Sequence, residues 1–276
     1  MASFEQSLEL HHPPANVGGA ATAFIARAFS RSAAVLVFLA IWEIAPRIGL
    51  VESAFLPPLS KVLRTGSQLV LNGQLISHIG ASLSRSLIGF GLALVLAVPL
   101  GLAIGWFKRL GDWLNPLLEL FRNTAALALL PVFLLLLGIG ESSKIALVLY
   151  SCSWPILLNT ITAVRNVDPL LIKSARTMGL SNLELLRKVV LPAAVPAVFV
   201  GVRLAAAHSL LVLVAAEMVG AKAGLGYLII YSQYNFQIPH MYVGIVTTTV
   251  LGLAFTQALM WFEQRFTGWR ALVAAE

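Results

Sequence analysis

Charge is scarce in this 276-residue chain: Asp, Glu, Lys and Arg make up 11% of it, against about 25% in a soluble domain. Hydrophobic residues make up 58%, and mean hydropathy is +0.86. This composition predicts lipid as the main solvent. There is one cysteine, Cys152, which excludes an intrachain disulfide; its apolar surroundings predict a small buried hydrophobe.

Several motifs are absent as well. The sequence has no Gly-x-x-x-x-Gly-Lys-Ser/Thr phosphate loop, so we expect no ATP bound by that route and no cofactor in this chain. It has no His-Glu-x-x-His, no cysteine pairs and no Gly-x-Ser-x-Gly, so metal-site, metalloprotease and hydrolase functions lack support, and no catalytic residue is predicted. The net charge of +7 does not indicate nucleic-acid binding, because the cations lie at the ends of apolar runs.

The apolar runs predict an all-α membrane protein with about six transmembrane helices, since a span needs about 20 apolar residues. The third run is broken by Arg122-Asn123-Thr124 and by Pro131, and a mildly amphipathic piece, Lys61–Leu71, is expected along the membrane surface. The expected domains are a cytoplasmic tail over 1–31, a transmembrane domain over 32–267 and a cytoplasmic tail over 268–276. The six runs are Ala33–Ile48, Leu87–Trp106, Leu114–Ile139, Ile145–Val164, Ala193–Val219 and Val243–Phe262.

Basic residues fix the expected orientation, because cytoplasmic loops of membrane proteins are enriched in Lys and Arg. Under six spans, one side carries more basic residues than the other, so both termini and the segment around Lys173 are expected in the cytoplasm. The richer side holds Arg27, Arg31, Lys108, Arg109, Arg165, Lys173, Arg176, Arg187, Lys188, Arg265 and Arg270, and the poorer side holds Arg47, Lys61, Arg64, Lys144 and Lys222.

The polar segment from Asp168 to Pro192 predicts two short helices joined by a turn. Asp168 suits a helix cap, and Gly179 suits the left-handed residue that ends a helix. Ser181 and Glu184 have the spacing of a capping box, and Pro192 should prevent the second helix from continuing undisturbed. The second helix is expected to expose its apolar side, Leu183, Leu186 and Val190. A well-capped loop without a partner is the alternative.

The pattern Lys173-Ser174-Ala175, then Gly179, then Val189-x-Leu191-Pro192 resembles the EAA loop of ABC-importer permeases, with Lys173 in the place of the usual Glu. The resemblance implies a type I importer permease fold in which the loop, residues 165–192, is a cytoplasmic coupling helix-turn-helix that docks into a separate ATPase. The coupling residues are then Ser174, Ala175, Gly179, Leu183, Leu186, Leu191 and Pro192.

Further motifs resemble the nitrate, sulfonate, taurine and bicarbonate branch of these permeases: Trp42-Glu43, Phe55 to Pro58, Ser82 to Arg85, Gly89-Phe90, Gly138 to Lys144, Ala215 to Glu217 and Gly224 to Tyr227. That resemblance implies a bacterial inner-membrane permease for a small anion. It also implies a second permease copy, two ATPase subunits that bind ATP, and an external solute-binding protein.

Polar residues inside the apolar runs are candidates for a translocation path, because charges at membrane depth usually face protein or water. The candidates are Arg122, Asn123, Thr124, Arg203 and Glu217. The break at Arg122 is the preferred site, because freed backbone groups and polar side chains occur together there. Arg203 and Glu217 could instead be structural partners between helices, and His208 is expected to be a packing residue.

The sequence leaves two other functions open. An intramembrane enzyme would pair Ser153 or Cys152 with His208, but nothing in their spacing requires this. A membrane scaffold without a path is the third possibility.

Overall fold

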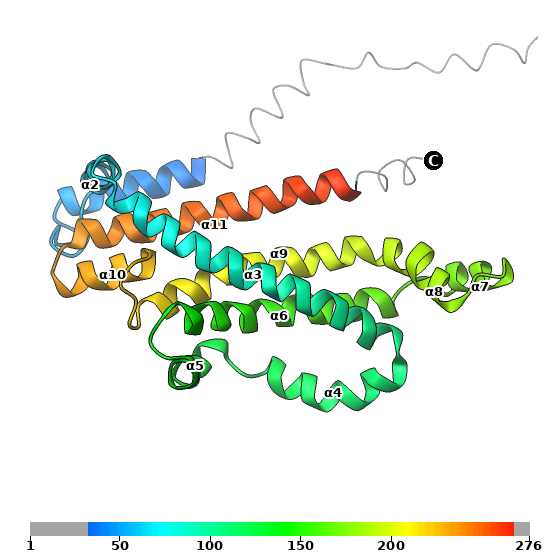
Figure 1. The fold of residues 1–276 in the computed structure, drawn as a ribbon. Helices are drawn as coiled ribbons and strands as arrows, with labels where there is room; N and C mark the ends of the chain where they lie inside the picture. Colours follow the sequence, from blue (N-terminus) through cyan, green and yellow to red (C-terminus); the bar gives the residue numbers. More distant parts are fainter. Residues whose placement is uncertain (1–32, 268–276) are drawn as a thin grey trace, which may run out of the picture. The chain divides into compact units, whose positions relative to one another are not determined.

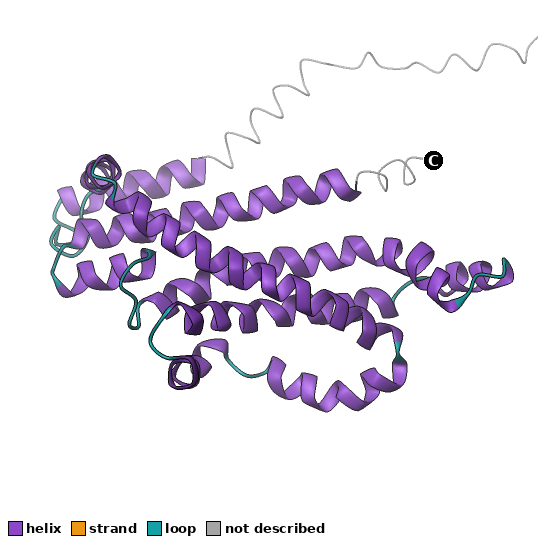
Figure 2. Cartoon of the chain, viewed as in Figure 1, coloured by secondary structure: helices purple, strands orange, loops and turns teal. Residues whose placement is uncertain are grey.

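The computed structural model describes residues 33–267, and every regular element in that range is helical (Figures 1 and 2). This confirms the all-α class. The chain forms two compact units that divide between Lys61 and Val62. The tails predicted over 1–31 and 268–276 lie outside the described residues.

In the first unit, a helix over residues 33–47 matches the first apolar run. Glu43, which interrupts that run, has a structural role. Its carboxylate accepts hydrogen bonds of 2.9 Å from both the backbone N–H and the hydroxyl of Ser60. Ser60 lies in the first turn of α2 (Leu59–Leu71), where the backbone N–H groups lack helical partners. Glu43 therefore caps the next helix.

In the second unit, α3 runs from Gln74 to Trp106. The sequence predicted only Leu87–Trp106 as a span and so missed the residues that open α3. Hydropathy found the apolar part of the helix alone. The polar part is helical too, and Ser82 and Arg85 within it are buried.

α3 packs closely on α6 (Glu141–Arg165) through its glycines. A methyl group added at Gly89, Gly101 or Gly105 would lie 2.7–2.8 Å from a β-carbon of α6, too close for any real contact. Gly91, in contrast, faces open space. Cys152 is buried beside Ala205 of α9 (Leu191–Glu217), as expected. Small residues thus let three helices share one core.

The third run is broken where the sequence predicted. α4 (Lys108–Arg122) is followed by a 3₁₀ turn (Ala126–Leu129) and by α5 (Leu130–Leu137), and the two parts meet at a bend of 84°. Pro131 is the second residue of α5, where proline is tolerated because the first N–H groups of a helix have no partner.

The described residues contain four helices long and apolar enough to cross a membrane, or five if the bent pair forms one span. The first predicted span, Ala33–Ile48, remains a prediction, because its helix over residues 33–47 begins at the edge of the described range. Between the last two predicted runs the chain forms a further helix, α10 (Leu225–Tyr234). α11 (Ile238–Thr267) follows it.

Candidate functional site

The polar segment between α6 and α9 forms the predicted helix-turn-helix. The Asp168 carboxylate accepts a 2.8 Å hydrogen bond from the first turn of α7 (Pro169–Thr177). Gly179 has a φ of +80° just after that helix. Ser181 and Glu184 form the capping box, in which each accepts from the other's backbone N–H, at 3.4 and 3.1 Å. The capping residues read from the sequence therefore occupy their predicted positions.

The second helix is not a separate element. α8 (Asn182–Leu185) passes through a π-helical turn (Leu186–Val190) directly into α9. Pro192 has no N–H to donate to the carbonyl four residues earlier. The wider turn accommodates this loss, so the helix is disturbed as predicted but continues.

The apolar residues of this segment divide between the bundle and the surface. Val190 is fully buried against Val164 and Ala194, so its predicted exposure was wrong, and Leu186 is half-buried in the same cluster. The continuous helix turns both residues toward the core. Leu183 is 58% exposed, as expected, and Met178 is 79% exposed.

The remaining predicted coupling residues also differ in exposure. Ala175 is buried, whereas Ser174, Gly179, Leu191 and Pro192 are exposed. In Figure 1, α7 and α8 project from the end of the second unit that lies opposite α10. The segment therefore presents exposed apolar side chains at one end of the bundle.

At the break of the third run, polar side chains satisfy the end of α4. The Asn123 amide and the Thr124 hydroxyl donate to the carbonyls of Glu119 and Leu120, at 2.8 and 3.1 Å. The Arg122 guanidinium pairs with the Glu119 carboxylate at 2.8 Å, and both side chains are about half exposed. An exposed pair of this kind contributes about 0–1 kcal/mol, so Arg122 remains available to other anions.

A pocket of about 460 Å³ opens beside this break. We call it the mid-depth pocket, because Tyr150 and Trp154 in its wall lie near the middle of α6, and His208 lies close to the middle of α9. Its polar and aromatic lining comprises Arg122, Thr124, Tyr150, Ser151, Trp154 and His208. His208 was predicted to be a packing residue, but it is exposed and lines this pocket.

The other predicted path residues lie elsewhere. Arg203 of α9 forms an ion pair with Glu263 of α11, which agrees with its structural alternative. The enzyme hypothesis paired Ser153 or Cys152 with His208, but both side chains bond to backbone carbonyls instead. Ser153 donates to the Leu149 carbonyl at 2.7 Å, and Cys152 to the Ala205 carbonyl at 3.4 Å.

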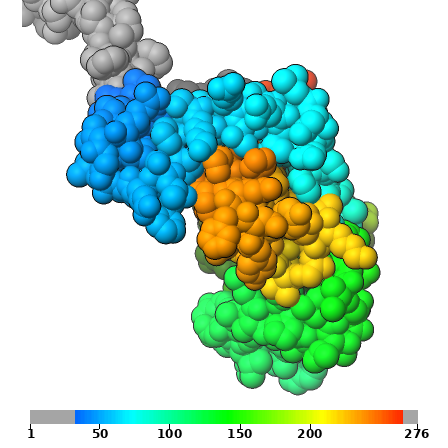
Figure 3. All heavy atoms as spheres, turned by 90° about the vertical axis from the view of Figure 1, so that its left-hand side faces the viewer, coloured from blue at the N-terminus to red at the C-terminus, as the bar shows by residue number. Residues whose placement is uncertain are grey.

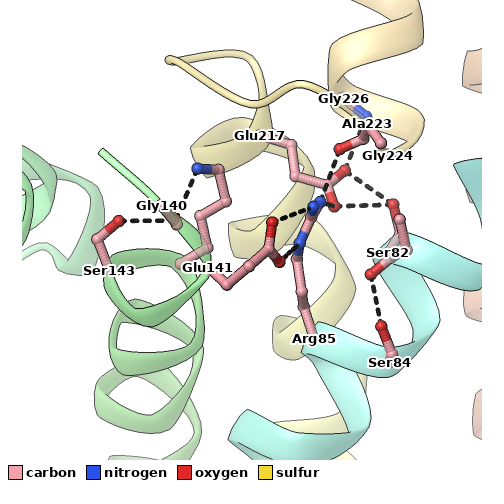
Figure 4. A network of polar contacts seen from close by, with 12 residues as sticks. Ser82, Ser84, Arg85, Gly140, Glu141, Ser143, Glu217, Ala223, Gly224 and Gly226 are labelled. Atoms are coloured by element: carbon pink, nitrogen blue, oxygen red, sulfur yellow. Dashed lines mark hydrogen bonds and ion pairs between the residues drawn. The ribbon is translucent and has the colours of Figure 1, made fainter. Parts of the chain in front are cut away.

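Glu217 is the centre of a buried polar cluster at the end of α9 (Figure 4). Its carboxylate is fully buried and accepts hydrogen bonds from the Ser82 hydroxyl at 2.8 and 2.9 Å. It also accepts from the Gly226 N–H at 3.0 Å and pairs with the Arg85 guanidinium at 2.6 Å. Arg85 in turn pairs with Glu141. We call Ser82, Arg85, Glu141, Glu217 and Gly226 the polar clamp.

The polar clamp joins α3, α6, α9 and the start of α10, and Figure 3 views this end, where yellow and orange residues lie between cyan and green ones. Two glycines allow the close approach. A methyl group at Gly224 (φ +123°) would collide with the Glu217 carboxylate, and one at Gly226 would collide with the Val214 carbonyl. The cluster is therefore closed by backbone as well as by side chains.

Sequence reasoning identified Glu217 but not Arg85 as a central residue. A signal was present, because four of the motifs that carried the family resemblance each contribute a residue here: Arg85, Glu141, Glu217 and Gly226. Motifs far apart in the chain thus mark a single three-dimensional cluster.

Helices long and apolar enough to cross a membrane, a bent pair and a capped polar loop define a multi-span helical membrane protein. Residues 89–268 match the family described as binding-protein-dependent transport system inner membrane component. The chain belongs to this family.

Named relatives support this family, and a solved structure supports the fold. SsuC of Bacillus subtilis, named for the transport of aliphatic sulfonates, is 32% identical over 234 residues, which cover 85% of each chain. TauC of Escherichia coli, a taurine transport permease, is 29% identical and covers 86% of this chain and 88% of its own. NrtB of Synechocystis, a nitrate import permease, is 31% identical and covers 83% and 86%. The inward-facing MetNI methionine ABC transporter shares the fold, with a TM-score of 0.63 at 20% identity, over 70% of this chain and 96% of that one. The predicted permease family and fold are thereby confirmed.

Proposed function

We propose that this permease imports a small anion by alternating access, driven by a separate ATPase that docks on residues 165–192. The observation that carries the proposal is the capped helix-turn-helix with exposed Met178 and Leu183 at one end of the bundle. Burying one such side chain against a partner contributes about 1.5–3 kcal/mol. A loop without a partner would gain nothing from them.

The anion class follows from two sources. The relatives are named for aliphatic sulfonates, taurine and nitrate, and the family resemblance extends to bicarbonate. The mid-depth pocket places the cation Arg122 beside hydroxyl groups. Both support a negatively charged solute.

The proposed assembly contains two copies of this chain, two cytoplasmic ATPases that bind ATP, and an external solute-binding protein. A homodimer is the simplest arrangement for a single permease sequence. The excess of Lys and Arg on one side supports cytoplasmic termini in the bacterial inner membrane. The exposed cations Lys173 and Arg187 belong to the same side as the proposed docking segment.

The decisive test replaces Leu183, an exposed apolar side chain of the proposed docking segment. Leu183→Asp should prevent co-purification of the ATPase, because a charge would be buried against the partner. Asn182→Asp is the matched control, since it adds the same charge to the neighbouring exposed position without removing an apolar side chain. Co-purification would be measured beside substrate-stimulated ATP hydrolysis. Wild-type values for Leu183→Asp would show that this segment is an ordinary loop.

Orientation is tested separately by single reporter cysteines in a Cys152→Ser background. A cysteine at Ser181 should react with an impermeant thiol reagent only from the cytoplasmic side, and one at Lys222 only from outside. Labelling of Ser181 from outside would refute the six-span topology.

A further inference from the structure

We propose that the mid-depth pocket is a solute site for a small organic anion with an apolar body, and that it selects against a bare inorganic anion. This inference rests on the proposed transport function and adds the chemical class of the solute. It also assigns the site to residues within one copy of the chain, contributed by α4, α6 and α9 and by the break after α4.

The polar part of the pocket favours an oxyanion. Arg122 has five guanidinium N–H donors, and its hydrogen bond to Glu119 involves one nitrogen. Ser151 adds a hydroxyl. Among the described residues that line the pocket, none is acidic. A cation would therefore meet Arg122 without a compensating carboxylate in the wall.

His208 adds a ring nitrogen to this end. Its Nδ1 lies 2.7 Å from the Leu204 carbonyl oxygen. Because a carbonyl oxygen only accepts, Nδ1 carries a hydrogen, so Nε2 of the neutral ring is an acceptor and gives no donor to an oxyanion. The bond to its own helix also fixes the ring. His208 therefore forms a fixed part of the pocket wall rather than of the helix core.

The hydroxyls of Tyr150 and Thr124 are already engaged. Tyr150 donates to the Phe121 carbonyl at 3.0 Å, and Thr124 to the Leu120 carbonyl at 3.1 Å. The Tyr150 bond joins α6 to the end of α4, and the Thr124 bond stays within the broken span. The donors left for an oxyanion are thereby limited to those of Arg122 and Ser151.

The rest of the wall is apolar and far larger than an inorganic anion needs. Leu127, Pro155, Leu158 and Val212 line it together with the ring of Trp154, whose face stacks on Phe121 at 6.0 Å between centroids. The volume of about 460 Å³ lies in the range of ligand sites, about 300–1,000 Å³. Nitrate would leave this wall uncovered, whereas an alkyl chain would bury it.

The test measures binding to the permease–ATPase complex in nanodiscs, with the solute-binding protein omitted so that its own selectivity does not contribute. The probes are methane-, ethane-, propane- and butanesulfonate and nitrate, which compete with radiolabelled butanesulfonate. We expect affinity to rise about fourfold for each buried methylene, and nitrate to compete weakly. Nitrate that competes as well as butanesulfonate would overturn the proposed selectivity.

Variants locate the site. Leu158→Trp should fill the apolar end and abolish the gain per methylene, and Leu158→Ala should move the optimum to longer chains. Leu135→Trp is the control, because Leu135 is 86% exposed and outside the pocket. Arg122→Gln should weaken the binding of every sulfonate about tenfold. Complex size is checked for each variant, and unchanged chain-length dependence in both Leu158 variants would overturn the assignment.

The two proposals can fail separately. If the wild-type chain does not retain the ATPase, the proposed transport function fails and this inference fails with it. If the ATPase is retained and is stimulated by solute, but the sulfonate series shows no dependence on Leu158, only the pocket assignment is lost.

Discussion

Arg85 and Arg122 both lie among the apolar helices of this permease, yet their surroundings differ. Arg85 is 5% exposed and contacts Glu141, Glu217 and the Ala223 carbonyl, which come from three other segments. Arg122 is about half exposed and pairs only with Glu119, one turn earlier in its own helix. The first arginine holds helices together, and the second leaves its charge accessible. Burial and the origin of the partners distinguish a structural cation from a candidate solute contact.

The comparison predicts its largest effect for Arg85→Met. The variant would leave Glu217 buried without its cation, which costs about 3–5 kcal/mol. Arg122→Met should change the free energy of unfolding by less than about 1 kcal/mol. Thermal unfolding of both variants in the same detergent checks the difference. Similar losses in both would mean that the polar clamp does not stabilise the bundle.

A smaller loss of stability is expected from replacing a glycine that packs against Glu217. Gly226→Ala places a methyl group against the Val214 carbonyl and 2.7 Å from the Glu217 Cβ, so overpacking should cost about 1–3 kcal/mol. Gly91→Ala is the control, because its added methyl group meets nothing within 4 Å. The same unfolding assay applies, and a neutral Gly226→Ala would show that the clamp has room to relax.

At the opposite end of the bundle, Gly179→Val should strain the turn by about 1–2 kcal/mol, because φ is +80° while the space around the position is open. We expect insertion to be normal and ATPase stimulation by substrate to be reduced. Gly179→Asn should retain more stimulation, since Asn tolerates the left-handed conformation. Equal activity of the Val and Asn variants would exclude a role for this backbone conformation.

The smallest loss of stability is expected from replacing Arg122, and this substitution should instead reduce solute transport. Arg122→Met should assemble with the wild-type yield but reduce solute uptake, because the pocket loses its cation. Uptake into proteoliposomes and complex yield would be measured together. A loss of assembly would instead identify Arg122 as structural, and wild-type uptake would place the path elsewhere.

Local chemistry allowed part of this structure to be predicted from sequence. Asp168, Gly179 and the Ser181–Glu184 box occupy their predicted positions, since capping depends on residues within a few positions of each other. The break after Arg122 was also correct, because polar residues and a nearby proline interrupt an apolar run. Hydropathy identified the main spans for the same reason: it sums a property of each segment alone.

Contacts between residues far apart in the sequence were decided only by the tertiary structure. The polar start of α3 is helical, and its buried Ser82 and Arg85 bond to Glu217, which lies 135 and 132 positions further on. Val190 is buried because a π turn carries α8 directly into α9. His208 reaches the mid-depth pocket because the broken span packs beside α6 and α9. A sequence determines which groups need a partner in a low-dielectric interior, but the packing of helices decides which partner each group receives.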